Sequence, residues 1–117
     1  MQMNEMKFSD GVPVDGYGPG FFRIAGQVVK GPICLGPTGV CDWQGFANLD
    51  PLIALGDAVD VILVGTGAEI ALLPELMRQS LEDAGFGVEP MSSPSACRTY
   101  NVLLSEGRRV ALAALPV

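Results

Sequence analysis

The run "VDVILV", residues 59–64, constrains the fold of this chain more than any other feature. Apart from Asp60, every side chain in the run is aliphatic, and most are β-branched. Such a run is typical of a central strand that is covered on both faces. It ends at Gly65-Thr66-Gly67, and a helical pattern follows. We therefore expect a buried strand inside a sheet that carries helices.

Helical and strand patterns alternate around this run. The segment "LDPLIALGD" predicts a short helix before it, with Asp50 as N-cap and Pro51 in the first helical position. The segment "AEIALLPELMRQSLEDAG" predicts a helix after it, which ends at Gly85, and "FGVEPM" predicts the next strand. We expect the apolar face of that second helix to consist of Leu73, Leu76, Met77, Leu81 and Ala84.

The last quarter of the chain completes the alternation. Ser93 is suited to cap a helix and Pro94 to begin it, so we expect a helix from Pro94 to about Glu106 that Gly107 ends. The segment "RRVALAALPV" predicts the last strand. Because strands and helices alternate with short connections, we expect a partly parallel sheet.

The first third contains short β-like pieces between Gly and Pro turns. They are "MKFSDG", "VDGYGPG", "FFRIAGQVVKG" and "PICLGPTG". In the third piece, "AGQ" suits a tight turn with "FRI" and "VVK" as its arms, and "PICL" predicts a buried strand. The predicted fold class is therefore α/β, as one domain over residues 1–117. It has a central mixed sheet, helices packed on that sheet, and an N-terminal antiparallel β-ribbon.

Charge and hydropathy exclude several function classes. The net charge is −6 with only seven Lys and Arg, so the chain lacks the basic patch that binds nucleic acid. Runs such as "VILV" and "IALL" are far shorter than the roughly 20 residues that span a bilayer. The start "MQMNEMKFSDG" lacks the pattern of a signal peptide. We expect a cytoplasmic protein, with peripheral attachment at the inner membrane as the alternative.

The absence of histidine and the spacing of the cysteines limit which catalytic and metal sites the chain can form. The chain has no histidine, which excludes Ser-His and Cys-His nucleophile pairs and HExxH zinc sites. Its three cysteines, Cys34, Cys41 and Cys97, have no CxxC spacing, so we expect reduced thiols and no zinc site. We expect no catalytic residue, no cofactor and no metal.

The turn Gly65-Thr66-Gly67 is the first candidate binding element, because open α/β sheets bind ligands where a strand ends before a helix. Glu89 follows at the distance of a ribose-binding acid. However, Ile70 occupies the position of the third glycine in GxGxxG, and Glu69 brings a negative charge to the expected phosphate position. A tight structural turn is the favoured interpretation over nucleotide binding.

The start of the last helix is the second candidate. A positive helix N-terminus and the adjacent Arg98 both favour a thiolate at Cys97. The favoured alternative is a small buried side chain, because Cys97, Asn101 and Leu104 share one stripe. Arg98 opposes the helix dipole, so it needs either an anionic ligand or an internal ion pair.

We favour the ion pair, with Glu89 or Glu106 as the partner of that arginine. Tyr100 and Asn101 need hydrogen-bond partners if they are buried, and they are expected to tie the helix to nearby loops.

Aromatic residues in Gly-rich loops leave two interpretations open. Trp43 and Phe46 in "CDWQGF" and Tyr17 in "DGYGPGFF" form a protein-contact patch if they are exposed. If they are packed, they close the open end of the sheet.

Three segments, "DGYGPGFFRIAGQ", "VILVGTG" and "EPMSSPSACRTYNVLLSEGRRVALAAL", resemble the domain-of-unknown-function family 498 over almost the whole chain. That family includes mitochondrial complex I assembly factor three and adipogenesis-associated domain proteins. The resemblance implies a three-layer, Mth938-like α/β fold and no established enzyme activity. The residues that match the family pattern are Gly65, Thr66, Gly67, Ala96, Cys97, Arg98, Thr99, Tyr100, Asn101, Glu106 and Arg108.

These observations together predict a non-catalytic protein-interaction domain that resembles an assembly factor and aids the biogenesis of a membrane complex. The expected partner is a protein, such as a membrane-complex subunit, and the oligomeric state is open. The alternative is a module that binds a small anion or a nucleotide. Under either hypothesis, the turn and the helix start form a shared cleft. Its predicted residues are Gly65, Thr66, Gly67, Ser95, Cys97, Arg98, Thr99 and Asn101.

Overall fold

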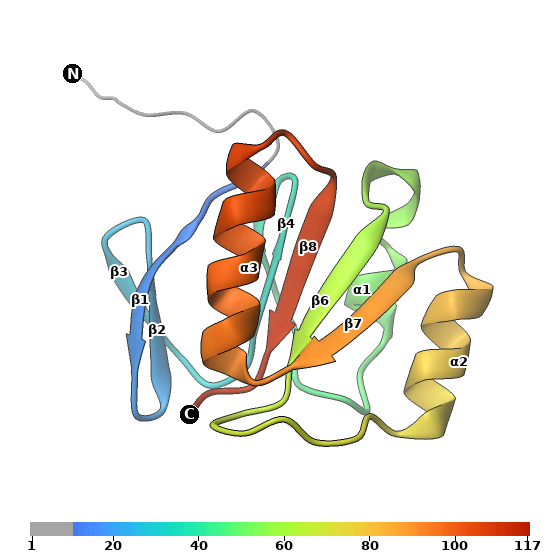
Figure 1. The fold of residues 1–117 in the computed structure, drawn as a ribbon, viewed down its shortest axis with the longest axis horizontal. Helices are drawn as coiled ribbons and strands as arrows, with labels where there is room; N and C mark the ends of the chain where they lie inside the picture. Colours follow the sequence, from blue (N-terminus) through green and yellow to red (C-terminus); the bar gives the residue numbers. More distant parts are fainter. Residues whose placement is uncertain (1–10) are drawn as a thin grey trace.

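The computed structural model describes residues 11–117, which form two sheets and three α-helices (Figure 1). Most of the predicted segment "MKFSDG" lies outside the described residues. The elements in chain order are β1 (Val14–Gly18), β2 (Phe21–Ile24), β3 (Gln27–Lys30), β4 (Ile33–Gly36), β5 (Gly39–Cys41), α1 (Asp50–Ile53), the short 3-10 turn η2 (Gly56–Ala58), β6 (Val61–Gly65), α2 (Glu75–Asp83), β7 (Gly87–Met91), α3 (Ser93–Ser105) and β8 (Val110–Ala114).

The N-terminal β-ribbon is confirmed as a three-stranded antiparallel sheet in the order β1-β2-β3. Ile24 pairs with Gln27, so the turn between β2 and β3 consists of Ala25 and Gly26. Both residues have positive φ, 53° and 78°. Positive φ at both positions is typical of the two-residue hairpin turns whose twist matches that of the strands. The predicted turn "AGQ" is thus one residue shorter, because Gln27 already belongs to a strand.

The second sheet is mixed and has the order β5-β4-β8-β6-β7. Strands β6 and β7 run parallel, as do β6 and β8, whereas β4 is antiparallel to both β5 and β8. The aliphatic run at residues 61–64 therefore lies in an interior strand, β6, with β8 on one side and β7 on the other. The predicted α/β class with a partly parallel central sheet is confirmed.

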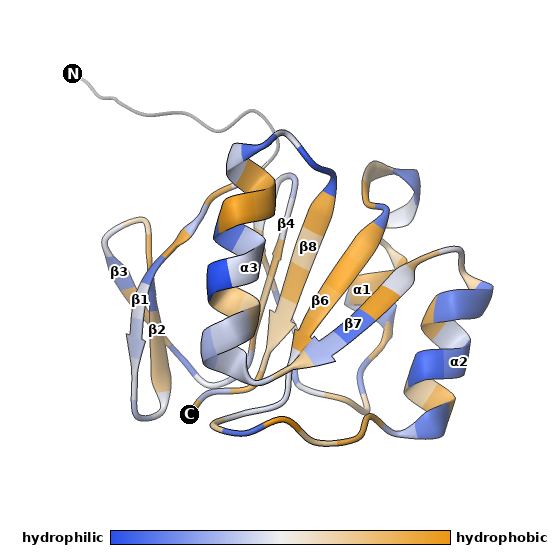
Figure 2. Ribbon diagram, viewed as in Figure 1, coloured by the Kyte–Doolittle hydropathy of each residue, from blue (hydrophilic) through white to orange (hydrophobic). Residues whose placement is uncertain are grey.

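Helices cover both faces of this sheet, which gives three layers (Figure 1). Successive side chains of β6 point to opposite faces, so Leu63 packs with α3 and the ribbon, whereas Ile62 and Val64 pack with α1 and α2. Figure 2 shows the interior strands β6 and β8 as the apolar centre of the molecule. The predicted coverage on both faces is confirmed.

Helix α2 starts later than the sequence predicts. It begins at Glu75, and residues 68–74 form an extended loop instead of its first turns. Pro74 explains the difference, because a proline disfavours the helical conformation of the residue before it. Met77 and Leu81 are buried as predicted, but Leu76 is 76% exposed and Ala84 also faces solvent. The predicted apolar face of this helix was therefore partly wrong.

Two predicted helix caps also differ. The N-cap of α1 is Leu49, without a side-chain hydrogen bond, and Asp50 is already helical. The N-cap of α3 is Ser92, whose hydroxyl oxygen accepts a hydrogen bond from the backbone N–H of Ser95 at 3.4 Å. Ser93 is unavailable as a cap because its hydroxyl is bonded to other segments.

Candidate functional site

Polar side chains of α3 bond to the backbone around β1. The Asn101 amide oxygen accepts a hydrogen bond from the N–H of Val14, and the Asn101 amide nitrogen donates one to the C=O of Val14, both at 2.8 Å. The Tyr100 hydroxyl donates to the C=O of Val12 at 2.8 Å. The expectation that these residues tie the helix to nearby loops is confirmed for Tyr100, because Val12 lies in the loop before β1, whereas Asn101 bonds to a residue of the strand β1 itself.

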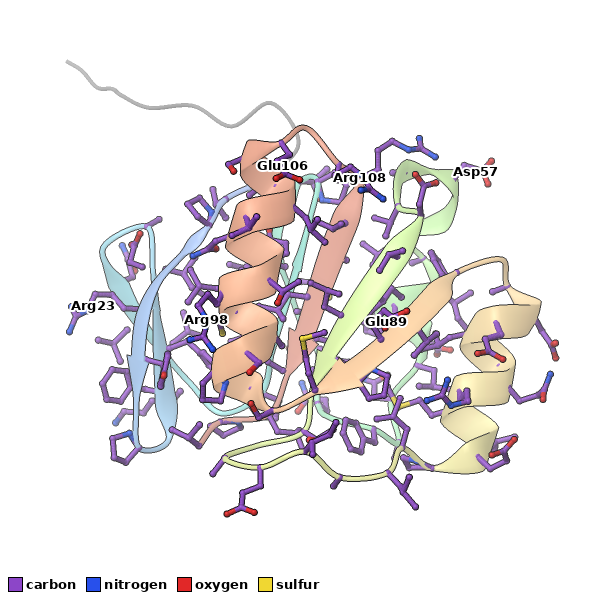
Figure 3. All side chains as sticks on the ribbon, in the orientation of Figure 1. Arg23, Asp57, Glu89, Arg98, Glu106 and Arg108 are labelled. Carbon is purple, nitrogen blue, oxygen red and sulfur yellow. The ribbon has the colours of Figure 1, made fainter. Side chains whose placement is uncertain are left out.

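This contact creates a shallow groove of about 190 Å³ between β1 and the N-terminal half of α3. It is lined by Val14, Asp15, Gly16, Tyr17, Pro94, Cys97, Arg98 and Asn101. Figure 3 shows the Arg98 side chain leaving α3 on the side of the ribbon. We call this hollow the β1–α3 groove.

The groove carries both signs of charge at its surface. Arg98 is exposed and forms no ion pair within residues 11–117, so the predicted pair with Glu89 or Glu106 was wrong. Figure 3 shows the reason, because Glu89 lies on β7 and Glu106 lies at the opposite end of α3. Asp15 is also exposed, and its carboxylate accepts a hydrogen bond from the N–H of Gly26 at 3.2 Å.

The thiol in this groove is in its neutral form. Cys97 is only 4% exposed, and burial raises the pKa of its thiol to about 11. It packs in the apolar core beside Ala96 and Leu104. The favoured interpretation as a small buried side chain is confirmed, and burial outweighs the helix N-terminus and Arg98.

The turn Gly65-Thr66-Gly67 is fixed by Ser93. The N–H of Gly67 donates to the Ser93 hydroxyl oxygen at 2.9 Å, and the N–H of Ser93 donates to the C=O of Gly67 at 2.7 Å. The Ser93 hydroxyl in turn donates to the C=O of Leu115 at 2.5 Å. One side chain thus joins the end of β6, the start of α3 and the end of β8. The turn has the structural role that the sequence analysis favoured.

A close backbone approach explains the first glycine of this turn. A Cβ atom on Gly65 would lie 2.7 Å from the Ser93 hydroxyl oxygen, 2.9 Å from Ser93 Cα and 3.0 Å from Ala114 Cβ. These distances are shorter than van der Waals contact. Gly67 has a φ of 108°, which favours glycine for a different reason.

Only three of the eight predicted site residues line the β1–α3 groove. These three are Cys97, Arg98 and Asn101. The lining does not include Ser95, Thr99 or the three residues of the turn. The binding role of the predicted residues stays a prediction.

Sequence reasoning missed Asp15 and Tyr17 as neighbours of Arg98. No local signal identifies them, because only the packing of α3 on β1 brings together residues about 80 positions apart. Tyr17 is 45% exposed at this groove. The other two aromatic residues are packed: Trp43 is 3% exposed, and its ring centroid lies 6.2 Å from that of Phe46. Of the two interpretations left open, Trp43 and Phe46 therefore follow the packed one, and Tyr17 follows the exposed one.

Within residues 11–117, no cluster of three or more His, Cys, Asp or Glu side chains is arranged to hold a metal ion. No helix in the same range combines the length and the apolar character needed to cross a bilayer.

The chain is similar to several known proteins. The model of a family described as "Protein of unknown function (DUF498/DUF598)" matches residues 14–115. An uncharacterized protein of Rhodobacter capsulatus is 50% identical over 117 residues, which cover all of this chain and 94% of that protein. NADH dehydrogenase (ubiquinone) 1 alpha subcomplex assembly factor 3 of Danio rerio is 31% identical over 115 residues. That match covers 92% of this chain but only 66% of the assembly factor.

Two solved structures share the fold. The crystal structure of an outer membrane protein from Bartonella henselae superimposes with a TM-score of 0.85 at 33% identity, covering 95% of this chain and 99% of that one. The solution structure of a Bordetella pertussis protein described as a Mth938-like domain gives a TM-score of 0.71 at 28% identity, covering 99% and 91%. The Mth938-like fold that the sequence resemblance implies is confirmed.

Proposed function

This chain belongs to the DUF498/DUF598 family, and from that premise we propose that it is a non-catalytic protein-interaction domain that assists the assembly of a membrane complex. The observation that carries the proposal is the match to assembly factor 3, at 31% identity over 92% of this chain. The match leaves about a third of that factor uncovered, so the proposal concerns an assembly role without a named complex.

The β1–α3 groove supports a protein partner more than a small ligand. Its volume of about 190 Å³ is below the roughly 300–1,000 Å³ of typical ligand pockets. Tyr17 and Arg98 line it with exposed side chains, and tyrosine and arginine are enriched among residues that dominate binding at protein interfaces. We propose that this groove contacts a membrane-complex subunit, and that the protein attaches peripherally at the inner membrane through that contact.

An anion-binding module has less support. The Asp15 carboxylate lines the same groove as Arg98 and repels an anion there. In the nearby turn, the N–H of Gly67 is already bonded to Ser93 and is not available to a phosphate.

The test combines a deletion strain with crosslinking. If the proposal is correct, deletion of the gene lowers the amount of one assembled membrane complex on native gels, and expression of the wild-type chain restores it. In detergent-solubilised cells, a tagged chain should crosslink to a subunit of that same complex. Arg98→Glu should lose this crosslink.

Arg23→Glu is the matched control for that variant. It makes the same charge change at an exposed arginine of β2 that does not line the groove (Figure 3). This control should keep the crosslink. The proposal is wrong if every membrane complex assembles normally in the deletion strain, or if both arginine variants crosslink equally well.

A further inference from the structure

The loop between β6 and α2 holds apolar side chains in solvent. Ile70 is 66% exposed, Leu72 96% and Leu76, in the first turn of α2, 76%. Figure 2 shows this stretch as an apolar segment along the edge of the molecule, where β6 ends. We call residues 68–76 the apolar loop. A single exposed leucine or isoleucine is common on a protein surface. Here three such side chains lie within seven residues and form an apolar patch, and such patches mark contact sites.

Hydrogen bonds with Thr66 hold the backbone of the first part of the apolar loop. The Thr66 hydroxyl donates to the C=O of Glu69 at 2.8 Å and accepts from the N–H of Ala71 at 2.9 Å. Leu73 packs against the core beneath α2, which directs its neighbour Leu72 outward. The conformation that exposes the patch is therefore built into the fold.

The patch also has a hollow that suits an apolar side chain. A cavity of about 360 Å³ is lined by Ile70, Ala71, Leu72, Leu73, Arg78 and Pro90. Arg78 is the one charged residue of this lining, and its guanidinium lies 3.4 Å from the carboxylate of Glu82 on the next turn of α2. The positive charge is thus compensated within the protein, and the rest of the lining is apolar.

Two carboxylates flank the patch along the chain. Glu69 and Glu75 lie at its two ends, both are exposed, and neither forms an ion pair within the described part of the chain. Residues 66–90 contain five carboxylates and a single arginine. Like charges repel, so this field disfavours an anionic lipid surface and favours a partner that carries lysine or arginine beside an apolar segment.

We infer that the apolar loop binds an apolar polypeptide segment flanked by Lys or Arg. The inference rests on the proposed function and names the chemistry of its partner. Membrane-spanning helices carry an excess of Lys and Arg at their cytoplasmic ends, next to an apolar stretch. Ile70, Leu72 and Leu76 contact the apolar stretch, and Glu69 and Glu75 pair with its basic flank.

The probe for this inference is a labelled peptide with a Leu/Ala core and two lysines at each end, and binding is measured by fluorescence anisotropy. The wild-type chain should bind it, and binding should weaken as NaCl is raised. The same core with two glutamates at each end should bind at least about tenfold more weakly. This comparison uses wild-type protein alone, so it does not depend on the folding of a variant.

Two variants locate the binding surface. Ile70→Ser/Leu72→Ser should weaken binding of the lysine-flanked peptide by about tenfold or more. Val28→Ser/Val102→Ser removes two exposed apolar side chains from other elements and should bind like wild type. Equal binding by both variants overturns the inference, as does equal binding of the two peptides. Tighter binding of wild-type chain to vesicles of phosphatidylcholine and phosphatidylglycerol than to the peptide also overturns it.

The deletion strain separates this inference from the proposed function. If wild-type chain restores a membrane complex and Ile70→Ser/Leu72→Ser restores it equally well, the inference about the apolar loop is wrong and the proposed function stands. If the deletion strain lacks no membrane complex, the proposed function is wrong whatever the peptide result.

Discussion

Asn101 and Val14 are joined by two hydrogen bonds of 2.8 Å, although 87 positions separate them in the chain. One amide side chain on α3 thus pairs with both backbone polar groups of a residue in β1. Val14 is 6% exposed, so water cannot easily replace the amide. The position of the β-ribbon on α3, and with it the β1–α3 groove, depends on this contact.

The first prediction concerns Asn101→Leu. The substitution leaves a buried N–H and a buried C=O of Val14 without partners, at roughly 1–3 kcal/mol each. We expect the free energy of unfolding, measured by urea titration, to fall by about 2–4 kcal/mol. Ser105→Ala is the control on the same helix, because its exposed hydroxyl bonds only to Val102 within that helix. A loss no larger than in the control would contradict the role of the amide.

The second prediction concerns Gly65→Ala. The added Cβ atom meets the Ser93 hydroxyl oxygen at 2.7 Å and Ser93 Cα at 2.9 Å, so α3 must shift away from β6. We expect the free energy of unfolding in the same urea titration to fall by about 1–3 kcal/mol, which is the usual effect of overpacking. Gly16→Ala should be nearly neutral, because nothing lies within 4 Å of its Cβ position. Similar losses in both variants would show that the close approach is not what requires Gly65.

Most of the fold was predictable because its elements have strong local patterns. The aliphatic run at β6 and the Ser-Pro start and Gly end of α3 identify these elements without any neighbour. The start of α2 was predicted too early because Leu73, Leu76 and Met77 are spaced like one helical face. The effect of Pro74 on the preceding residue outweighs that spacing and leaves Leu73 in the loop, whereas Leu76 and Met77 lie in α2.

The candidate site was less predictable, because its neighbours come together only through tertiary packing. Cys97, Arg98 and Asn101 share a helix and could be found by periodicity. Asp15 and Tyr17 join them only through the packing of β1 against α3, to which Asn101 and Tyr100 contribute hydrogen bonds. Ser93 shows the opposite case, since its sequence suits an N-cap while its hydroxyl serves Gly67 and Leu115.

The third prediction concerns the pH dependence of stability. Burial raises the pKa of Cys97 from 9.0 to about 11, so the folded state holds this proton more tightly than the unfolded state. The contribution of this bound proton to the stability of the folded state is fully present below about pH 9 and is lost as pH rises toward 11. Between about pH 8 and pH 10.5, the free energy of unfolding, measured by urea titration, should fall by about 1–2 kcal/mol less in Cys97→Ala than in wild type.

Two other groups lower the stability of wild type and of Cys97→Ala at alkaline pH. Burial also raises the pKa of Cys34 and of Tyr100, so the comparison between wild type and variant is what isolates Cys97. At neutral pH, iodoacetamide should modify the half-buried Cys41 before Cys97, as read by peptide mass spectrometry. Faster modification of Cys97 would mean that its thiol is activated after all.

The fourth prediction concerns Asp60 and Arg109, which join the start of β6 to the start of β8. Hydrogen bonds from Arg109 Nη2 at 2.8 Å and Nε at 3.2 Å hold the pKa of the Asp60 carboxyl below its ordinary value of 3.8, and the charge of Arg108 adds to this effect. An NMR titration of the Asp60 carboxyl carbon should show this pKa rise toward 3.8 in Arg109→Gln.

Arg108→Gln is the control for this titration, because Arg108 acts on Asp60 through charge without a hydrogen bond. It should raise the pKa less than Arg109→Gln does. Since a lowered carboxyl pKa stabilises the folded state above the unfolded value, the contribution of this pair is present at neutral pH and disappears as pH falls below about 4. Both side chains are more than half exposed, at 52% and 62%, so the loss in acid should be small and should shrink in about 1 M NaCl. An unchanged pKa in Arg109→Gln would mean that the ion pair does not persist in solution.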